Sequence, residues 1–411
     1  MVTAEEALAR VLDHIRPLPI VHNKPIAATL GQILAAPVSS CWPLPQVAVS
    51  VMDGYAVHGA DIVDTQDPPK LPVVGESAAG HPFTGVFPQG TCIKVSTGAA
   101  VPSASVVVVP REEAQSSPES DLIQFSTDAV RSAERGRFVR RAGSDVSDGE
   151  RLLDSGILLS PGDLALAASS GHRTLPVHRV PRVAVLCTGD ELIAIGETPQ
   201  PGQIIGTNGM MLAMQIRAAG GVPVMLDDAS DHPDALNAAF DRALICDLLV
   251  TSGGISVGAH DLVYRELTAR GFITHFRKAR LRPGKPTTFG TLPRSQSPGL
   301  PVLALPGNPA STYVTFELFG GPAIRRLSGY PIDRCALPRR RVRLAAPAHG
   351  EATRTHFVRA RVVDNSATPL ATQTSGDLRS ISGHNALLVV PEGQLETPAG
   401  SYLDAILLRY H

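Results

Sequence analysis

The sequence predicts a multidomain protein of mixed α/β and β class, in which one α/β domain with a parallel sheet accompanies smaller β-rich domains. The chain has 411 residues, which is too long for one ordinary hydrophobic core. Residues 181–329 alternate near-continuous apolar strands with amphipathic helices, the pattern of a parallel sheet covered on both faces. Glycine (37) and proline (35) are frequent and charged residues (18%) are few, so many turns and short strands are expected elsewhere.

The first half of the chain begins with one amphipathic helix and continues as β structure. Apolar residues recur at helical spacing between residues 3 and 16, and Thr3 stands three residues before Glu6, the spacing of a capping box. From about residue 46 to 136, short apolar runs such as KLPVVGE, TCIKVSTGAA and SVVVVP are separated by proline and glycine. This pattern is typical of an all-β module and not of a βα repeat.

The segments on either side of the α/β pattern are shorter. Residues 137–180 indicate a strand followed by a helix, with Pro161 at the start of the helix and Gly171 at its end. We expect this segment to connect the neighbouring modules. Residues 330–411 return to short β-runs separated by glycine and proline, and predict a small barrel or sandwich.

Composition excludes several classes of protein. The net charge is −1 and no block of like charges occurs, so a field that would collect nucleic acid or anionic lipid is not expected. The first twenty residues carry acids where a signal peptide would be basic and apolar, and no apolar run reaches the ~18 residues of a membrane helix. We therefore expect a cytosolic protein without a membrane segment.

The five cysteines predict neither a disulfide framework nor a zinc site. They lie far apart in the sequence and never approach C-x-x-C spacing: Cys41, Cys92, Cys187, Cys246 and Cys335. Four of them stand in or beside apolar runs, and we expect those four to be buried thiols.

Three strands of the α/β pattern end in loops rich in glycine and hydroxyl groups: CTGDEL (187–192), TSGGISVG (251–258) and LPGNPAS (305–311). Ligands of open parallel sheets bind beyond such strand ends. Gly253 and Gly254 would let backbone N–H groups approach an anion, and the helix after Asn308 would direct its positive end to the same place. These loops predict a phosphate-binding site, although adjacent glycines can also serve only a tight turn.

Acidic residues fall at the same strand ends, namely Asp190, Glu191, Asp231 and Asp261. Carboxylates beside a phosphate repel it, so such a group is most simply explained by a bound divalent cation. All-oxygen ligands favour Mg²⁺. The alternative is that each acid caps a helix or lies in a solvated loop.

Basic residues gather in the stretch RLRPGKP, which carries Arg280, Arg282 and Lys285 on one loop. Arginine can bind an oxyanion through two parallel hydrogen bonds, whereas lysine acts as a point charge. A solvated basic loop is the alternative. The thirteen histidines show no metal-ligand spacing, and neither a catalytic triad nor a P-loop can be identified.

A series of motifs spans nearly the whole chain. It comprises SVMDGYAV (50–57), STGAAVP (96–102), RRAGSDV (140–146), CTGDEL, GQIIGTN (202–208), TSGGISVG followed by Asp261, RPGKP, LPGNPAS and SGHNALLV (382–389). In these residues and their order, the chain resembles the MoeA family of molybdopterin molybdenumtransferases, to which the E domain of gephyrin belongs.

The resemblance implies four domains. They are a connector from residues 1–45 and 137–180, an inserted β domain from 46–136, a three-layer α/β domain like that of MoaB and Mog proteins from 181–329, and a C-terminal β-barrel from 330–411. It also implies an elongated cytoplasmic homodimer. The active site would lie between the α/β domain of one subunit and the inserted domain of the other.

The resemblance further implies a reaction in which adenylylated molybdopterin and molybdate give molybdenum cofactor and AMP with Mg²⁺. An adenylyltransferase upstream and chaperones of molybdoenzymes downstream would be partners. The implied catalytic residues are Asp53, Thr97, Asp145, Asp190, Glu191, Asp231 and Asp261, of which Glu191, Asp231 and Asp261 would hold the metal. The implied substrate-binding residues are Ser252, Gly253, Gly254, Ser256, Pro306, Gly307 and Asn308 for the pterin-phosphate end, and Lys278, Arg282 and Lys285 for molybdate, with Arg359 and Ser380 as helpers.

The chain departs from the family pattern at five positions. Ala48 and Val49 replace a polar pair, Val106 and Ser144 replace acids, and Arg282 replaces a lysine. Arginine is larger than lysine and its donors are planar, so the last change is not conservative around a compact oxyanion. Three hypotheses follow: an active insertase, a paralogue that inserts poorly or prefers tungstate, and a non-enzymatic scaffold.

Overall fold

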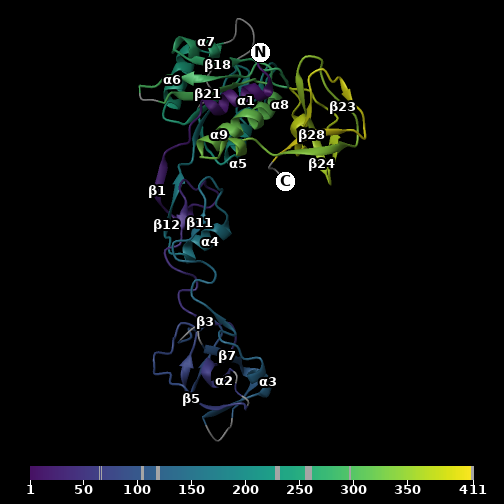
Figure 1. Cartoon of the computed structure of the whole chain (residues 1–411). Coiled ribbons are helices and arrows are strands. Elements are labelled where there is room, and N and C mark those ends of the chain that lie inside the picture. Colours follow the sequence, from purple (N-terminus) through teal and green to yellow (C-terminus); the bar gives the residue numbers. More distant parts are fainter. Residues whose placement is uncertain are drawn as a thin grey trace.

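The computed structural model describes residues 1–63, 65, 67–102, 106–116, 121–226, 232–254, 262–295 and 298–408. Figure 1 shows an elongated molecule in which the α/β domain and the C-terminal barrel lie side by side at one end. The inserted domain forms the other end, and the connector lies between them. Of the helices in these ranges, none combines the length and the apolar character that crossing a membrane requires.

The α/β domain contains one six-stranded sheet. Its order is β16 (Val222–Met225), β13 (Arg182–Cys187), β17 (Leu248–Ser252), β21 (Leu300–Leu305), β20 (Thr288–Leu292) and β18 (Ile273–Arg277). The first four strands are parallel, whereas β20 runs antiparallel to both of its neighbours. The parallel sheet expected from the sequence is therefore interrupted by one strand, because β20 and β21 are joined by a short hairpin and not by a crossover helix.

Helices cover both faces of this sheet and complete three layers. On one face, α5 (Asn208–Ala218) packs with a continuous helical run made of α8 (Pro309–Thr315), the π-helical η3 (Phe316–Gly320) and α9 (Gly321–Leu327). On the other face lie α6 (Pro233–Ala243) and α7 (Leu262–Ala269). Successive residues of β13 alternate between the two cores, as strand geometry requires.

The N-terminal helix α1 (Ala4–Asp13) forms as expected, with the predicted capping box. The Glu6 N–H donates to Thr3 Oγ1 at 3.0 Å, and the Thr3 N–H donates to Glu6 Oε2 at 2.8 Å. Ala7 and Val11 are fully buried in the same core as β13 and α9. The helix therefore lies on the α/β domain and not in the connector, to which residues 1–45 were expected to belong.

The connector is built from two pairs of strands and one helix. β1 (Ile20–Pro25) pairs with β12 (Thr174–His178), and β2 (Val38–Ser39) pairs with β11 (Arg151–Leu153). Short η1 (Ile26–Ala28) and α4 (Pro161–Ser169) complete it, and α4 begins at Pro161 as predicted. At the junction with the α/β domain, the Arg179 guanidinium donates to both oxygens of Asp247 at 2.6 and 3.0 Å.

The inserted domain is one six-stranded sheet with short helices. Its order is β7 (Val106–Pro110), β4 (Gly54–His58), β6 (Cys92–Val95), β5 (Lys70–Ser77), β9 (Leu122–Phe125) and β8 (Ala114–Ser116). The helices are α2 (Gly59–Ile62), η2 (Arg111–Glu113) and α3 (Thr127–Arg131). The chain enters and leaves the domain through the pair β3 (Val49–Ser50) and β10 (Val139–Arg140).

The C-terminal domain is a closed barrel, which decides between the two folds that the sequence left open. The ring runs through β24 (Thr355–Val363), β25 (Ser366–Pro369), β22 (Arg339–Leu344), β28 (Tyr402–Leu407) and β26 (Ala386–Val390), which pairs with β24. The short pair β23 (Ala348–His349) and β27 (Glu396–Thr397) and the turns η4 (Ile332–Arg334) and η5 (Leu378–Ile381) complete it. One strand of the α/β domain, β19 (Leu281–Arg282), adds to β24 and joins the two domains.

The cysteines are unlinked, as expected. Cys92, Cys187, Cys246 and Cys335 are buried, and Cys41 is exposed. Burial raises the pKa of Cys92 to about 12 and that of Cys335 to about 11, so both remain protonated thiols.

Candidate active site

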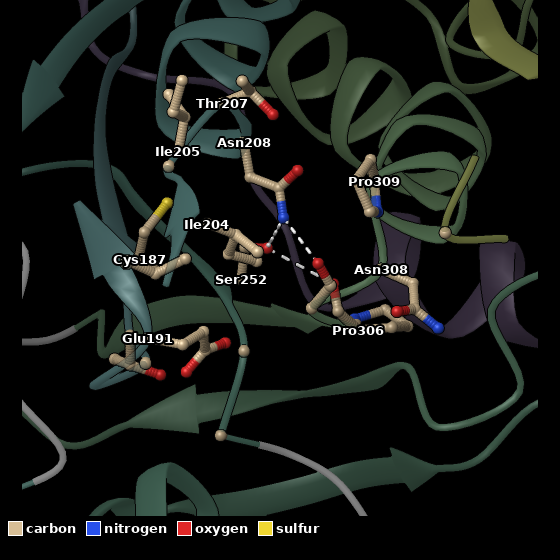
Figure 2. Close-up of a pocket in the computed structure, with 18 of the residues that line it drawn as sticks. Cys187, Glu191, Ile204, Ile205, Thr207, Asn208, Ser252, Pro306, Asn308 and Pro309 are labelled. Atoms are coloured by element: carbon tan, nitrogen blue, oxygen red, sulfur yellow. Dashed lines mark hydrogen bonds between the residues drawn. The ribbon is translucent and has the colours of Figure 1, made fainter. Parts of the chain in front are cut away.

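A pocket of about 900 Å³ lies beyond the carboxyl ends of β13, β17 and β21, where the three glycine-rich loops meet. The predicted residues Ser252, Gly253 and Gly254 line it from one side, and Pro306, Gly307 and Asn308 line it from another. Figure 2 shows Ser252 facing Pro306 across this end of the pocket. The three loops predicted from the sequence therefore form one site, at the place where ligands of such sheets bind.

Gly253 and Gly254 adopt positive φ angles of 100° and 63°. A Cβ on Gly253 would lie 2.4 Å from the Thr188 carbonyl oxygen, and one on Gly254 would lie 2.4 Å from Val263 Cγ2. The turn itself therefore requires glycine at both positions, whatever the pocket binds. Evidence for a ligand must come from the groups around the turn.

Asn208 supplies part of that evidence. It is the first residue of α5, and its Nδ2 donates to Ser252 Oγ at 3.0 Å and to the Gly307 carbonyl at 2.7 Å (Figure 2). Its Oδ1 is buried without a hydrogen-bond partner in the described structure, and so is Thr188 Oγ1. Both residues line the pocket. Unpartnered polar atoms in such positions are costly, so they indicate a ligand that completes their hydrogen bonds.

Two helices begin at the pocket. The amino end of α5 is at Asn208, and that of α8 is at Pro309, directly after Asn308. Helix amino ends carry a partial positive charge, which favours an anion. At α8 this charge is the main contribution, because Pro309 has no N–H and the Ala310 N–H donates to the Ser375 carbonyl at 3.0 Å. The polar side of the pocket therefore suits a phosphate.

The other side of the pocket is apolar. The short pair β14 (Leu192–Ile193) and β15 (Ile204–Ile205) provides Leu192, Ile204 and Ile205, and Leu378 comes from η5 of the barrel. Asn308 Nδ2 donates to Ser375 Oγ at 3.2 Å, which holds this part of the barrel against the start of α8. A planar ring system could pack on this wall while its phosphate reaches the polar side.

Of the two predicted acids in the loop CTGDEL, Glu191 lines the pocket. Asp190 is exposed and does not line it. Glu191 folds back over Gly189, whose φ is 151°, and a Cβ there would lie 2.7 Å from Glu191 Oε2. Asp231, Asp261 and Ser256 lie outside the described residues. Within the described ranges, no cluster of three or more His, Cys, Asp or Glu side chains forms a metal site.

The basic loop reaches the pocket through Pro286, next to Lys285. Lys285 is exposed, Lys278 is half-buried with a φ of 70°, and Arg282 Nη1 donates to Glu351 Oε1 of the barrel at 2.7 Å. The alternative of a solvated loop fits Lys285, whereas Arg282 is engaged in an ion pair between domains.

Arg359 is the least expected feature of this region. The side chain is fully buried in β24, and its Nε donates to the Ser380 carbonyl at 3.1 Å. Its Nη1 and Nη2 have no hydrogen-bond partner among the described residues. Burial, with a smaller contribution from Arg282, lowers the pKa of Arg359 to about 10, so the group stays charged at neutral pH. Ser380 is itself buried, and its hydroxyl donates to the Thr374 carbonyl.

The predicted residues of the inserted domain lie far from this pocket in the same chain, at the other end of the molecule (Figure 1). Asp53 Oδ1 accepts from the Thr97 N–H at 2.6 Å and from Thr97 Oγ1 at 2.9 Å. These two bonds lower the pKa of Asp53 below its ordinary value. Asp145 forms an ion pair with Arg140, and Ser144 Oγ donates to it at 3.1 Å.

The departures from the family pattern differ in their surroundings. Val106 is fully buried in β7 of the inserted sheet, so this position belongs to a core and not to the pocket. Ser144 touches Asp145, and Arg282 touches Glu351. Val49 belongs to β3 and pairs with Arg140, while Ala48 is half-buried beside it.

Sequence reasoning missed several residues of the site, above all Asn208, Thr188 and the apolar pair Ile204 and Ile205. Each belongs to a motif that was recognised, CTGDEL or GQIIGTN, but nothing in the linear pattern distinguished it from its neighbours.

Comparison with known proteins agrees with this geometry. Models of the MoeA N-terminal region (domain I and II), of a probable molybdopterin binding domain and of the MoeA C-terminal region (domain IV) match residues 2–171, 184–326 and 341–408. The chain is 33% identical to the molybdopterin molybdenumtransferase of Nostoc, over 93% of this chain and 87% of that protein. It is also 33% identical to molybdopterin molybdenumtransferase 2 of Mycobacterium tuberculosis, over 97% of each.

A solved structure resembles the whole molecule. The crystal structure of a molybdopterin biosynthesis MoeA protein from Pyrococcus horikoshii matches with a TM-score of 0.85 and 27% identity, over 99% of each chain. The chain therefore belongs to the MoeA family.

Proposed function

We propose that the chain is a molybdenum insertase, which converts adenylylated molybdopterin and molybdate to molybdenum cofactor and AMP. The observation that carries this proposal is a pair of neighbouring sites. A pocket in which Asn208 Oδ1 and Thr188 Oγ1 have no partner among the described residues adjoins a barrel segment, η5, behind which lies the buried cation Arg359. A phosphorylated ring compound and a small oxyanion would thus meet at one place.

The pterin would pack on the apolar wall at Ile204, Ile205 and Leu378, with its phosphate at the polar side. There the positive ends of α5 and α8 and the Thr188 hydroxyl suit the phosphate, whereas Asn208 Oδ1 can only accept and would bind an N–H or O–H group of the ligand. The carbonyls and hydroxyls around Asn208 fix the shape of this side before the ligand arrives, which reduces the entropy that binding would cost.

Molybdate, a tetrahedral dianion, would bind at Arg359, with Arg282 and Lys285 from the basic loop, Lys278 just before that loop, and Ser380 as support. A buried guanidinium whose two Nη groups lack partners is expected to bind an anion, because leaving it unpaired costs several kcal/mol. Pro286 and Leu378 line the pocket next to these residues, so the oxyanion would approach the pterin end.

Mg²⁺ would be held by Glu191 together with Asp231 and Asp261. Glu191 supports this assignment because its carboxylate lines the polar part of the pocket and offers the oxygen ligands that Mg²⁺ prefers. When bound, the ion would neutralise the charge that develops on the phosphates as AMP leaves.

A second subunit would complete the site. Asp53 and Thr97 belong to the inserted domain, at the other end of the molecule from this pocket, and Asp145 lies between that domain and the connector. These residues could take part only if a partner subunit brought its own copies to this pocket. We therefore propose a homodimer in which each pocket receives Asp53 from the other subunit.

The test is AMP release from adenylylated molybdopterin at fixed Mg²⁺, with molybdate, with sulfate and without added oxyanion. An insertase should release AMP in a molybdate-dependent manner. Lack of release under all three conditions would reject the proposal.

A second candidate is a paralogue that inserts molybdenum poorly or prefers tungstate. The ion pair between Arg282 and Glu351 favours poor insertion, because it occupies a group that would otherwise face the oxyanion. The same assay with tungstate decides between the two, as does the Arg282→Lys variant. Molybdate-dependent release only in that variant would identify Arg282 as the reason for the change of ligand.

A further inference from the structure

The parallel pairing of β19 with β24 brings four charged side chains together between the basic loop and the barrel. It sets Arg282 beside His356 in the register, three residues before Arg359 on the same strand. Glu351 and Arg354 come from the segment that precedes β24. Two guanidinium groups, those of Arg282 and Arg354, bind one carboxylate, that of Glu351, while Arg359 lies close enough to feel the charge of Arg282.

Glu351 is shared by two of these arginines. Its Oε1 accepts from Arg282 Nη1 at 2.7 Å and from Arg354 Nη2 at 2.8 Å, and its Oε2 accepts from Arg354 Nε at 2.7 Å. The Glu351 side chain is only 18% exposed, against 44% for Arg282. The mostly buried carboxylate of Glu351 therefore fixes the position of the more exposed Arg282 side chain.

The third arginine receives nothing from Glu351. Arg359 has no hydrogen-bond partner for Nη1 or Nη2 among the described residues, and the neighbouring His356 Nε2 is also unpartnered. Burial keeps His356 neutral at physiological pH, since it lowers the pKa to about 4. The cluster therefore has more positive charge than its own carboxylate balances, and an arriving dianion would compete with Glu351 for Arg282.

We propose that Glu351 is an internal competitor of the oxyanion, which holds Arg282 by an ion pair in the ligand-free protein and must release it when the oxyanion binds beside Arg359. This rests on the proposed function, in which Arg282 and Arg359 bind molybdate. Glu351 is a positioning residue that acts through Arg282 and does not touch the substrate. Its effect is to weaken oxyanion binding.

A second ion pair on the same loop provides a matched control. Arg280, two residues before Arg282, pairs with Glu392 of the barrel at 3.6 Å, and both side chains are more than a third exposed. Glu392→Gln removes the same charge from the same end of the barrel but leaves Arg282 and Glu351 in contact. A general change of the local field would appear in both variants.

The experiment measures binding of molybdate to the full-length protein by equilibrium dialysis at low ionic strength. Glu351→Gln should bind molybdate more tightly by on the order of tenfold, the value of one competing charge-assisted hydrogen bond. Glu351→Asp should also bind more tightly, because the shorter side chain keeps its charge but cannot reach both arginines. Glu392→Gln should match the wild type.

Two results would overturn the proposal. One is unchanged or weaker binding by both Glu351 variants. The other is a full gain from Glu351→Gln in an Arg282→Ala background, where Arg282 is no longer present to be released. Saturable binding by the wild type with neither variant improved would reject the role of Glu351 and leave the molybdate site intact. Absence of saturable binding in every protein, with melting temperatures unchanged, would instead reject the molybdate site on which the proposal rests.

Discussion

Asn208 Nδ2 lies 2.7 Å from the carbonyl oxygen of Gly307 and 3.0 Å from Ser252 Oγ, so one amide group joins the loops that follow three different segments of the α/β domain. The remaining atom of that amide, Oδ1, has no partner among the residues that the structure describes. Asn208 thus shapes the pocket, and we propose that it also binds the ligand.

Replacing Asn208 with alanine should raise the KM for adenylylated molybdopterin by about tenfold or more, because a ligand hydrogen bond is lost and the loops are no longer joined. Steady-state AMP release would measure it. Asn237→Ala is the control, since Asn237 makes comparable hydrogen bonds to Pro233 and Glu266 on the other face of the sheet. An equal rise of KM in both variants would mean that KM rises because the fold is destabilised, and not because a contact with the ligand is lost.

Gly254→Ala should destabilise the protein by about 1–3 kcal/mol, since the new Cβ would clash with Val263 and the backbone is in the left-handed region. The clash distance is 2.4 Å and φ is 63°. Gly383 has a φ of 78°, but a Cβ added there would meet no atom within 4 Å, so Gly383→Ala isolates the backbone contribution. Urea unfolding compares the two, and equal losses would show that the contact with Val263 is unimportant.

Thr97→Val should raise the pKa of Asp53 without restoring its ordinary value of 3.8. The variant removes the bond from Thr97 Oγ1 but keeps the backbone N–H bond, which is the larger cause of the shift. A carboxyl NMR titration of both proteins measures this. An unchanged pKa would mean that the hydroxyl does not bond to Asp53 in solution.

His356 should make the barrel sensitive to acid. Its pKa is lowered from 6.5 to about 4, mainly by burial, so the unfolded chain binds a proton more readily than the folded one. The contribution to stability is complete above pH 6.5 and is lost as the pH falls toward 4. At pH 5 the loss should be on the order of 2 kcal/mol.

Unfolding by urea at pH 7 and pH 5 would measure this loss, and His356→Gln should reduce the difference between the two. The exposed His349 of the same barrel provides the control, since its substitution should leave the pH dependence as it is. A wild-type stability that does not change between these two values would contradict the prediction.

The local signals of the sequence were reliable where a single segment determines its own structure. Thr3 and Glu6 formed the expected capping box, and Pro161 began the expected helix. Because parallel strands place their carboxyl ends at one edge, the strand pattern alone was enough to assign Ser252 and Gly307 to one site.

Contacts between segments that are distant in the sequence could not be predicted from such local signals. The amphipathic pattern of α1 specifies an apolar face but not the surface that it covers, and that surface turned out to be the α/β core. Arg359 stands in an ordinary strand pattern, and its burial, with no ion pair to it among the described residues, follows from the closure of the barrel and the approach of β19. The direction of β20 likewise depends on a hairpin that apolar periodicity does not encode.

The pairing of β19 with β24 also fixes two arginines relative to each other, whereas Asp53 is joined to them only through the connector. Arg282 and Arg359 belong to strands of one ladder, so their separation is fixed by backbone hydrogen bonds. Asp53 is carried at the end of the slender connector, which meets the α/β domain at the Arg179–Asp247 ion pair. Because Asp53 is far from this junction, a rotation of the connector about Arg179 would displace Asp53 much more than residues near the junction, and it would leave the distance between Arg282 and Arg359 unchanged.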